Sequence, residues 1–205
     1  MKKPVLIAML FWLGVSSFAQ PSAGKIFIGG NLGLYTVVDK TKTEGTTQIN
    51  STDHYITVLP MAGYYLSEKM AVGIRTGIDI QIYKTPDAFM DKEVMSTFVI
   101  NPFGRYYLIA GTGGLFAEAS VYTGIGSDKE YFEADSFKQN LLTFSAGVSP
   151  GVYYYITSKL SLEAKFGWLG YETDVTKDGD TKEITNFFGL SISPDTFTFG
   201  LTYTL

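Results

Sequence analysis

Apolar and polar residues alternate with a period of two through most of this chain. Ile74, Ile78 and Ile82 share one parity, whereas Arg75 and Asp79 occupy the other. Successive side chains of a β-strand point to opposite faces, so this pattern predicts strands with one apolar and one polar face. The strands that it predicts are 25–38, 54–66, 70–83, 94–109, 115–125, 140–156, 160–173 and 184–205.

The connections between these strands alternate in length. Tight turns are predicted at 67–69, 110–114 and 157–159. Polar stretches rich in Lys, Asp, Glu, Thr and Gly are typical of solvated loops, and they lie at 39–53, 84–93, 126–139 and 174–183. The fold class that this order predicts is all-β: an eight-stranded, up-and-down antiparallel transmembrane β-barrel with short periplasmic turns and long extracellular loops.

The charged positions indicate which face of the barrel meets lipid. The ionisable residues on the polar parity are Arg75, Asp79, Arg105, Glu118, Glu163 and Lys165, and the opposite parity carries almost no charge. This predicts lipid outside and a polar lumen closed by a network of paired charges. Arg105 and Glu118 flank the 110–114 turn at nearly equal distances, so a direct cross-strand pair is expected. A soluble periplasmic ligand-binding barrel, the weaker alternative, would place its charges outside.

A weak internal repeat places tyrosines at one end of the barrel. The segments that begin at Pro60, Pro102 and Pro150 each lead to paired tyrosines just before a tight turn. We expect an aromatic belt at the periplasmic interface, formed by Tyr64, Tyr65, Tyr106, Tyr107, Tyr153, Tyr154, Tyr155 and Tyr203. Each proline removes a ladder hydrogen bond, so bulges are expected nearby.

The last predicted strand changes phase. Phe197, Phe199 and Leu201 lie at odd-numbered positions, whereas Leu190 and Ile192 lie at even-numbered positions. A bulge at 193–195 within one strand is the preferred interpretation, and a separate short strand is the alternative.

The first residues predict export. Lys2 and Lys3 precede an apolar stretch, and Ser17 and Ala19 are the small residues of a signal-peptidase site. Residues 1–19 are therefore predicted to be a cleaved signal peptide and residues 20–205 the barrel domain. The composition includes no cysteine, one histidine and a net charge of −4, the wrong sign for binding nucleic acid.

Little in the sequence predicts catalysis. His54 lies beside Asp53 and near Ser51, which leaves an outer-membrane lipid-modifying hydrolase as the alternative function, although Ser and Asp are routine turn residues. Asp174, Asp178 and Asp180 lack the spacing of a calcium loop. We expect no enzyme activity, no catalytic residue, no metal and no cofactor.

Four features resemble a known family, the small outer-membrane β-barrel domain proteins of Gram-negative bacteria (the porin-family or OmpA/OmpX-like barrels). They are the cleavage site Ala19-Gln20, the strand Gly29-Gly30-Asn31-Leu32-Gly33, the Pro-x-x-Gly-Tyr-Tyr plan at Pro60 and the closing segment 197–203. The resemblance implies an eight-stranded barrel and insertion by the barrel-assembly machinery, which reads a final strand that usually ends in Phe; here the last residue is Leu205.

The expected function follows from these patterns. The chain is predicted to be a non-enzymatic integral outer-membrane barrel, with a plugged polar interior, that contributes to envelope structure or to surface contact through its loops. Its expected partners are outer-membrane lipid, including lipopolysaccharide, and the barrel-assembly machinery, with no nucleic acid; the sequence does not specify an oligomeric state.

Overall fold

The computed structural model describes residues 23–43, 46–86, 92–109, 111–131, 136–179, 181–192 and 197–205, so the predicted signal peptide lies outside the described residues. The strands are β1 (Ile26–Thr43), β2 (Thr46–Tyr65), β3 (Met70–Lys84), β4 (Lys92–Tyr107), β5 (Gly113–Tyr131), β6 (Ser136–Tyr155), β7 (Leu160–Lys165), β8 (Trp168–Asp178), β9 (Thr181–Ser191) and β10 (Thr198–Thr204). The described part of the chain contains no helix long and apolar enough to cross a membrane.

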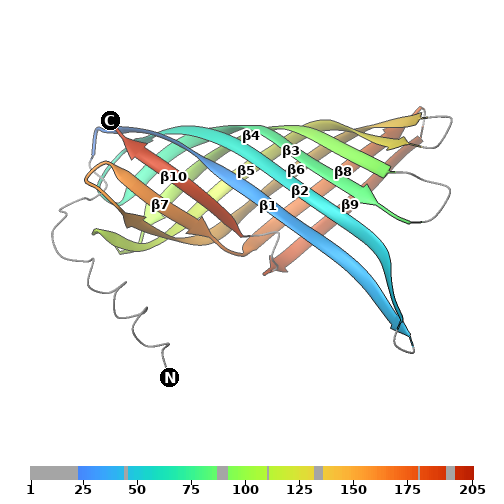
Figure 1. The fold of residues 1–205 in the computed structure, drawn as a ribbon. Coiled ribbons are helices and arrows are strands. Elements are labelled where there is room, and N and C mark those ends of the chain that lie inside the picture. The colour runs from blue at the N-terminus through green and yellow to red at the C-terminus, as the bar shows by residue number, and fades with distance from the viewer. Residues whose placement is uncertain are drawn as a thin grey trace, which may run out of the picture.

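The strands form one antiparallel barrel, and the ring of paired strands is complete at the end that carries the tight turns (Figure 1). β1 to β6 pair in sequence order, and β10 returns to pair with β1. β7 and β8 are the two halves of one barrel position because both pair with β6; β9 and β10 likewise occupy the next position, beside β8 and β7. The ten strands therefore make eight barrel positions, which confirms the predicted eight-stranded barrel.

The strands are longer than predicted. The polar stretches 39–53, 126–139 and 174–183, expected to be long loops, lie mostly within β1, β2, β5, β6, β8 and β9. In β1 and β2 the ladder continues out to the pair Thr43 and Thr46. Loops were predicted because these stretches are polar at both odd and even positions. A two-stranded hairpin that extends beyond the membrane is exposed to water on both faces, so it has the same composition. The long-loop prediction is therefore wrong for these stretches.

Two barrel positions are interrupted. Phe166 and Gly167 separate β7 from β8, and Gly167 adopts a φ of 71°, which glycine tolerates. The register shifts by one residue between the pairs Gly151–Lys165 and Val148–Leu169, so a bulge lies opposite Pro150. β9 and β10 are separate strands, so the preferred interpretation of one bulged strand over 184–205 is wrong and the alternative of a separate short strand is confirmed. Residues 193–195, where the bulge was expected, lie outside the described residues.

The other two prolines produce no bulge. Near Pro60 the pairs Val58–Ile78 and Met61–Arg75 keep one register, although Pro60 itself has no ladder partner in β3. Pro102 pairs with Ile74 in an unshifted ladder. The expectation of three bulges is therefore wrong at Pro60 and Pro102, because a gap in the ladder accommodates a missing N–H without an extra residue.

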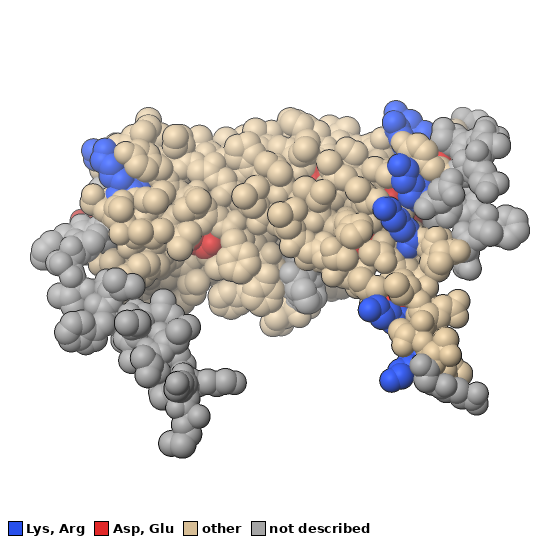
Figure 2. Space-filling view, viewed as in Figure 1, with Lys and Arg blue, Asp and Glu red and all other residues tan. Residues whose placement is uncertain are grey.

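The two faces of the barrel differ in chemistry. The outward-facing residues in the middle part of the strands are large and apolar. Leu32, Ile78 and Phe98 are examples, each between 44% and 60% exposed. Figure 2 shows one face on which the middle of the barrel is almost free of charge, whereas Lys and Arg lie at the two ends. The interior holds the buried polar residues, so the usual order of a soluble barrel is inverted.

Candidate functional site

A buried ion-pair network crosses the half of the lumen nearest the tight turns. Arg105 donates from Nε to Glu118 Oε2 at 2.7 Å and from Nη1 to Glu163 Oε1 at 2.8 Å. Glu118 also accepts from Arg75 and, at 2.9 Å, from Lys165 Nζ. The side chains of Arg75, Arg105 and Glu118 are at most 1% exposed. Side chains from β3, β4, β5 and β7 thus meet at one level of the barrel.

Neutral polar groups complete this network. Arg75 donates to Asn31 Oδ1 at 2.7 Å and to Asn101 Oδ1 at 2.9 Å, and Asn101 in turn donates to the carbonyl of Val121. Thr202 donates to Glu163 at 2.8 Å. Asn31, Asn101 and Thr202 were not predicted as site residues, because neutral polar residues are common at the inward-facing positions of a strand. Their inward-facing parity is the feature of the sequence that could have identified them.

Asp79 does not join the network. Its Oδ2 accepts from Tyr122 at 2.8 Å, and its buried Oδ1 accepts no hydrogen bond from the described residues. Of the six charged residues predicted for the lumen, the structure therefore connects Arg75, Arg105, Glu118, Glu163 and Lys165. These are three cations and two anions, so the network has one more positive charge than the balanced set that was expected.

An aromatic cluster lies between the network and the tight turns. It contains Phe27, Tyr65, Phe103, Tyr107, Phe116, Tyr153 and Tyr155, all at most 5% exposed. Arg105 lies over the rings of Phe103 and Phe116, at 5.1 and 4.6 Å from their centroids. The guanidinium is thus held by carboxylates on one side and by aromatic faces on the other.

The predicted aromatic belt is divided between the two faces. Tyr64, Tyr106, Tyr154 and Tyr203 face outward and are 41–46% exposed. Tyr65, Tyr107, Tyr153 and Tyr155 were predicted for the same belt, but they are buried in the lumen cluster. Neighbouring residues of a strand point to opposite faces, so two adjacent tyrosines cannot both face lipid. The belt prediction is wrong for these four.

A separate chamber occupies the lumen on the other side of the network. This outer chamber has a volume of about 520 Å³. It is lined by Tyr35, Tyr55, Thr57, Asp79, Ile80, Gln81, Met95, Thr97, Tyr122, Leu141, Thr143, Glu172, Asp174 and Thr176. Tyr35 and Tyr55 stack with ring centroids 4.2 Å apart, Gln81 donates to Tyr55 at 2.8 Å, and Thr143 donates to Asp174 at 2.6 Å.

Carboxylates also gather at the outer mouth of the lumen, beyond the membrane-spanning part. Burial and the charge of Asp128, with smaller effects of Glu130 and Asp53, raise the pKa of Glu93 to about 7. Among the described residues, no group of three or more His, Cys, Asp or Glu side chains is placed so that it could hold a metal ion.

Lysines at the same end face the other way. On β1, β3, β4, β5, β6, β8 and β9 they continue the parity of the exterior apolar residues, and all are exposed. This lysine collar consists of Lys40, Lys42, Lys84, Lys92, Lys129, Lys138, Lys177 and Lys182. Positive charge therefore lies outside the barrel wall at this end and negative charge inside it.

The residues considered for hydrolysis are separated by the barrel wall. Ser51 is buried and shares its parity with Asp53, whereas His54 is on the opposite parity of β2. His54 Nδ1 lies 3.0 Å from Thr36 Oγ1 on the neighbouring strand. Ser51 and His54 therefore do not form a nucleophile and base pair. Of the aspartates considered for calcium, Asp174 binds Thr143 in the lumen, and Asp180 lies outside the described residues.

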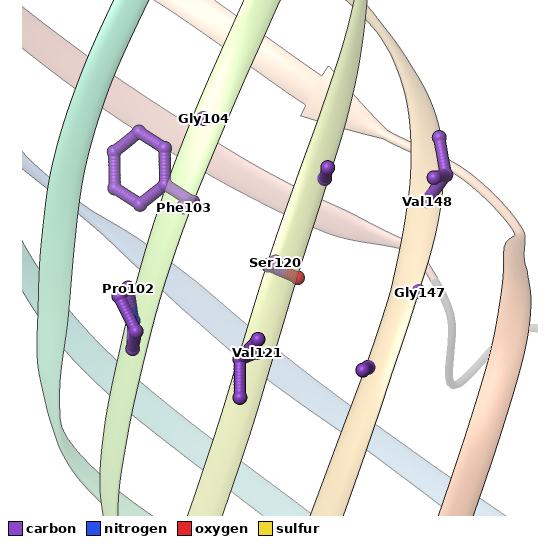
Figure 3. Close-up of a pocket in the computed structure, with 9 residues that line it drawn as sticks. Pro102, Phe103, Gly104, Ser120, Val121, Gly147 and Val148 are labelled. Atoms are coloured by element: carbon purple, nitrogen blue, oxygen red, sulfur yellow. The ribbon is translucent and has the colours of Figure 1, made fainter.

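A shallow groove marks the outer surface across β4, β5 and β6 (Figure 3). It has a volume of about 550 Å³, and its exterior residues are small or apolar, including Pro102, Val121 and Val148. A Cβ atom added at Gly104 would meet no atom within 4 Å. The groove is open to the side where lipid chains would lie.

Comparisons with known proteins find similarity of fold only. No family model and no curated protein sequence matches the chain. The attachment invasion locus protein Ail of Yersinia pestis aligns over 89% of this chain and 99% of its own, with 11% identity and a TM-score of 0.46. Neisserial surface protein A aligns over 88% and 97%, with 14% identity and a TM-score of 0.42. The N-terminal β-barrel domain of Pseudomonas aeruginosa OprF aligns over 89% and 98%, with 11% identity and a TM-score of 0.41.

The class of the protein follows from its own two faces. A closed antiparallel barrel with an apolar exterior, outward tyrosines at one end and a polar, charge-paired lumen is the arrangement of a transmembrane β-barrel of the outer-membrane type.

Proposed function

We propose that the chain is a non-enzymatic integral protein of the bacterial outer membrane that contributes to envelope structure and to contact at the cell surface. The observation that carries the proposal is the order of the exterior: outward tyrosines, then an uncharged apolar band, then the lysine collar. The predicted signal peptide, 1–19, supplies the export route, and the alternating final strand supports insertion by the barrel-assembly machinery.

The dimensions of the exterior agree with this placement. Tyr106 and Lys92 lie at opposite ends of β4, fourteen residues apart. With a rise of about 3.3 Å per residue and a tilt of about 40°, this corresponds to roughly 35 Å along the barrel axis. This distance accommodates the apolar band of about 25 Å that is typical of outer-membrane barrels, and it leaves space for lipid headgroups at the two ends. The tyrosines then mark the periplasmic interface and the lysine collar lies among the outer headgroups.

The lysine collar is suited to anionic headgroups. Its ammonium groups are exposed and lie on the lipid side of the wall, where phosphates of lipopolysaccharide would meet them. Surface contact is proposed through the outer hairpin ends of the strands, since these replace the long loops that were expected.

The lumen is proposed to be closed to ions. An eight-stranded barrel has an interior that side chains just fill. Here the ion-pair network and the aromatic cluster occupy successive levels, and both consist of residues at most 6% exposed apart from Lys165. A continuous water path would have to displace paired charges, which is costly.

Membrane integration is tested first. The full chain, expressed in a Gram-negative host, should remain in the outer-membrane fraction after salt and carbonate washes and should migrate faster on a gel when unboiled than when boiled. Recovery as a soluble protein without heat-modifiable mobility would overturn the proposal.

Closure of the lumen is tested in a planar bilayer. The folded protein should give no porin-like conductance steps under conditions in which a general porin, added as the control, does. Steps of porin size from the unmodified chain would refute the closed lumen while leaving membrane integration intact.

The lipid contact is tested with matched lysine variants. Lys92→Gln, Lys129→Gln and Lys138→Gln combined should abolish most of the rise in thermal midpoint that lipopolysaccharide gives the unmodified protein. The control combines Lys25→Gln, Lys69→Gln and Lys159→Gln at the opposite end, which changes net charge equally and should keep the rise. Equal loss in both variants would overturn the assignment of the collar.

A further inference from the structure

The barrel wall has a seam between β1 and β9. β1 pairs with β10 only as far as Leu32, and from Gly33 outward the described residues place no strand on that side of it. β9 pairs with β8 along its whole length, and no described strand pairs with its other edge. Figure 1 shows the outer part of the β1–β2 hairpin leaving the barrel, away from the outer ends of β8 and β9. The seam is thus flanked by two strand edges that have no ladder partner among the described strands.

This seam lies within the apolar band. Leu34 beside it on β1 is 74% exposed, and Phe188 and Leu190 on β9 are 78% and 64% exposed. These values are among the highest of the exterior because a side chain at an edge lacks a neighbouring strand to cover it. The seam therefore faces the hydrocarbon of the outer leaflet, where irregular backbone is tolerated only beside a polar cavity.

A polar cavity does lie behind the seam. Tyr35 of β1 and Glu172 and Asp174 of β8 are among the residues that line the outer chamber. β8 is the direct neighbour of β9. The chamber thus reaches β1 on one side of the seam and β8, the neighbour of β9, on the other side. The seam is therefore a candidate lateral route between the chamber and the membrane.

The chamber wall favours a positively charged group that also has apolar surface. Asp79, Glu172 and Asp174 contribute carboxylates, and the described lining contains no Lys, Arg or His. Asp79 Oδ1 is buried and accepts no hydrogen bond from the described residues, so it has capacity for a donor. The stacked rings of Tyr35 and Tyr55 and the side chains of Met95 and Leu141 complete the wall. Carboxylates together with aromatic faces are the groups that bind organic ammonium ions.

We propose that the outer chamber binds the head of a cationic amphiphile, an alkylammonium, which enters from the outer leaflet through the β1–β9 seam and leaves its tail in the membrane. The inference rests on the proposed membrane integration. Heat-modifiable mobility is therefore measured first, so that failure to insert and failure to bind give different results.

Binding is measured through Trp168, which stacks on Phe187 of β9 and pairs in the ladder with Ser191 at the inner end of the seam. Trp12 lies in the predicted signal peptide, so Trp168 is the only tryptophan of the predicted mature chain. The probes are a bromine-tailed dodecylammonium and a bromine-tailed dodecanoate of equal length, added to the protein in phosphatidylcholine vesicles. Saturable quenching by the ammonium, at a concentration at least about tenfold below that for the carboxylate, is expected. Equal quenching by both probes, or saturable quenching by neither, would overturn the proposal.

Carboxylate variants test where the head binds. Asp79→Asn and Glu172→Gln, made separately, should each raise the half-saturating concentration of the ammonium several-fold. Glu183→Gln on β9 removes the same charge from a carboxylate that does not line the chamber, and it should behave as the unmodified protein. Unchanged binding in both chamber variants, each with native heat-modifiable mobility, would overturn the chamber as the binding site.

The lateral route is tested by bridging the seam. The chain has no cysteine, so Thr36→Cys with Leu190→Cys can be joined specifically by a flexible bifunctional maleimide, with mass spectrometry to establish the bridge. The control pair, Thr36→Cys with His54→Cys, bridges two strands that are already paired. Loss of quenching in the first bridged protein alone supports lateral entry. Full quenching in both bridged proteins would show that the probe enters from the outer mouth, and it would overturn the lateral route. A dimer of the chain that covers the seam and excludes both probes would also overturn the lateral route.

Discussion

Arg105 and Glu118 are directly opposed across the β4–β5 ladder, and their side chains are joined by a hydrogen bond of 2.7 Å from Nε to Oε2. Glu118 also accepts from Arg75 and Lys165, so one carboxylate neutralises charge from three strands. Arg105 joins it to Glu163. The pair is thus the centre of the structure that closes the lumen.

Replacement of this carboxylate should be costly. Glu118→Gln leaves Arg75, Arg105 and Lys165 with only Glu163 in a buried site, and removal of one partner from a buried ion pair costs about 3–5 kcal/mol. We expect the urea midpoint for unfolding from vesicles to fall accordingly. Glu183→Gln, an exposed carboxylate of β9, is the control. A difference between the two variants of less than about 0.5 kcal/mol would contradict the central role of Glu118.

The geometry of Arg105 should matter as well as its charge. Its Nε and Nη1 reach two different carboxylates while the plane of the group lies over Phe103 and Phe116. Arg105→Lys keeps the charge but presents a single ammonium, which lacks this forked geometry. We expect a loss of about 1–3 kcal/mol in the free energy of unfolding. Lys159→Arg at an exposed turn should be neutral, and an Arg105→Lys protein as stable as the unmodified one would show that charge alone suffices.

Much of the fold could be predicted because alternation is a local property. Inward charges such as Arg75 and Glu163 and outward residues such as Ile78 follow directly from parity. The same parity rule places Tyr64 on the outer face and Tyr65 in the lumen, which is the arrangement in the structure.

Other features could not be predicted because they depend on pairing between distant strands. The separation of Asp79 from the network is set by the level at which β3 and β5 bring it to Tyr122. The seam arises because β10 is short and because β8 is the one described strand that pairs with β9, which no pattern within either segment indicates. The positions at which the strands end within the polar stretches could not be predicted either, because a polar hairpin and a polar loop have similar compositions.

Close packing in the aromatic cluster predicts a sharp contrast between two glycines. A Cβ at Gly63 would lie 2.1 Å from Phe27 Cζ, whose ring is fully buried, whereas a Cβ at Gly104 would meet nothing within 4 Å. Gly63→Ala should therefore destabilise the barrel by about 1–3 kcal/mol through overpacking, and Gly104→Ala should change the stability little. Urea unfolding of the two variants gives the comparison. Equal stability would mean that the Phe27 ring is free to move aside.

The raised pKa of Glu93, about 7, predicts a pH dependence of stability. Its ordinary value is 4.5, so between these two pH values the folded state binds the proton that the unfolded state releases. The contribution of Glu93 to stability is then fully present below about pH 4.5 and is lost as the pH rises through 7. Because Glu93 is only half-buried at a wet mouth, solvent screening reduces the effect to the order of 1 kcal/mol. The unmodified protein should therefore unfold at lower urea at pH 8 than at pH 5. Glu93→Gln should show a smaller difference, and an unchanged difference in that variant would show that Glu93 is not the source of the pH dependence.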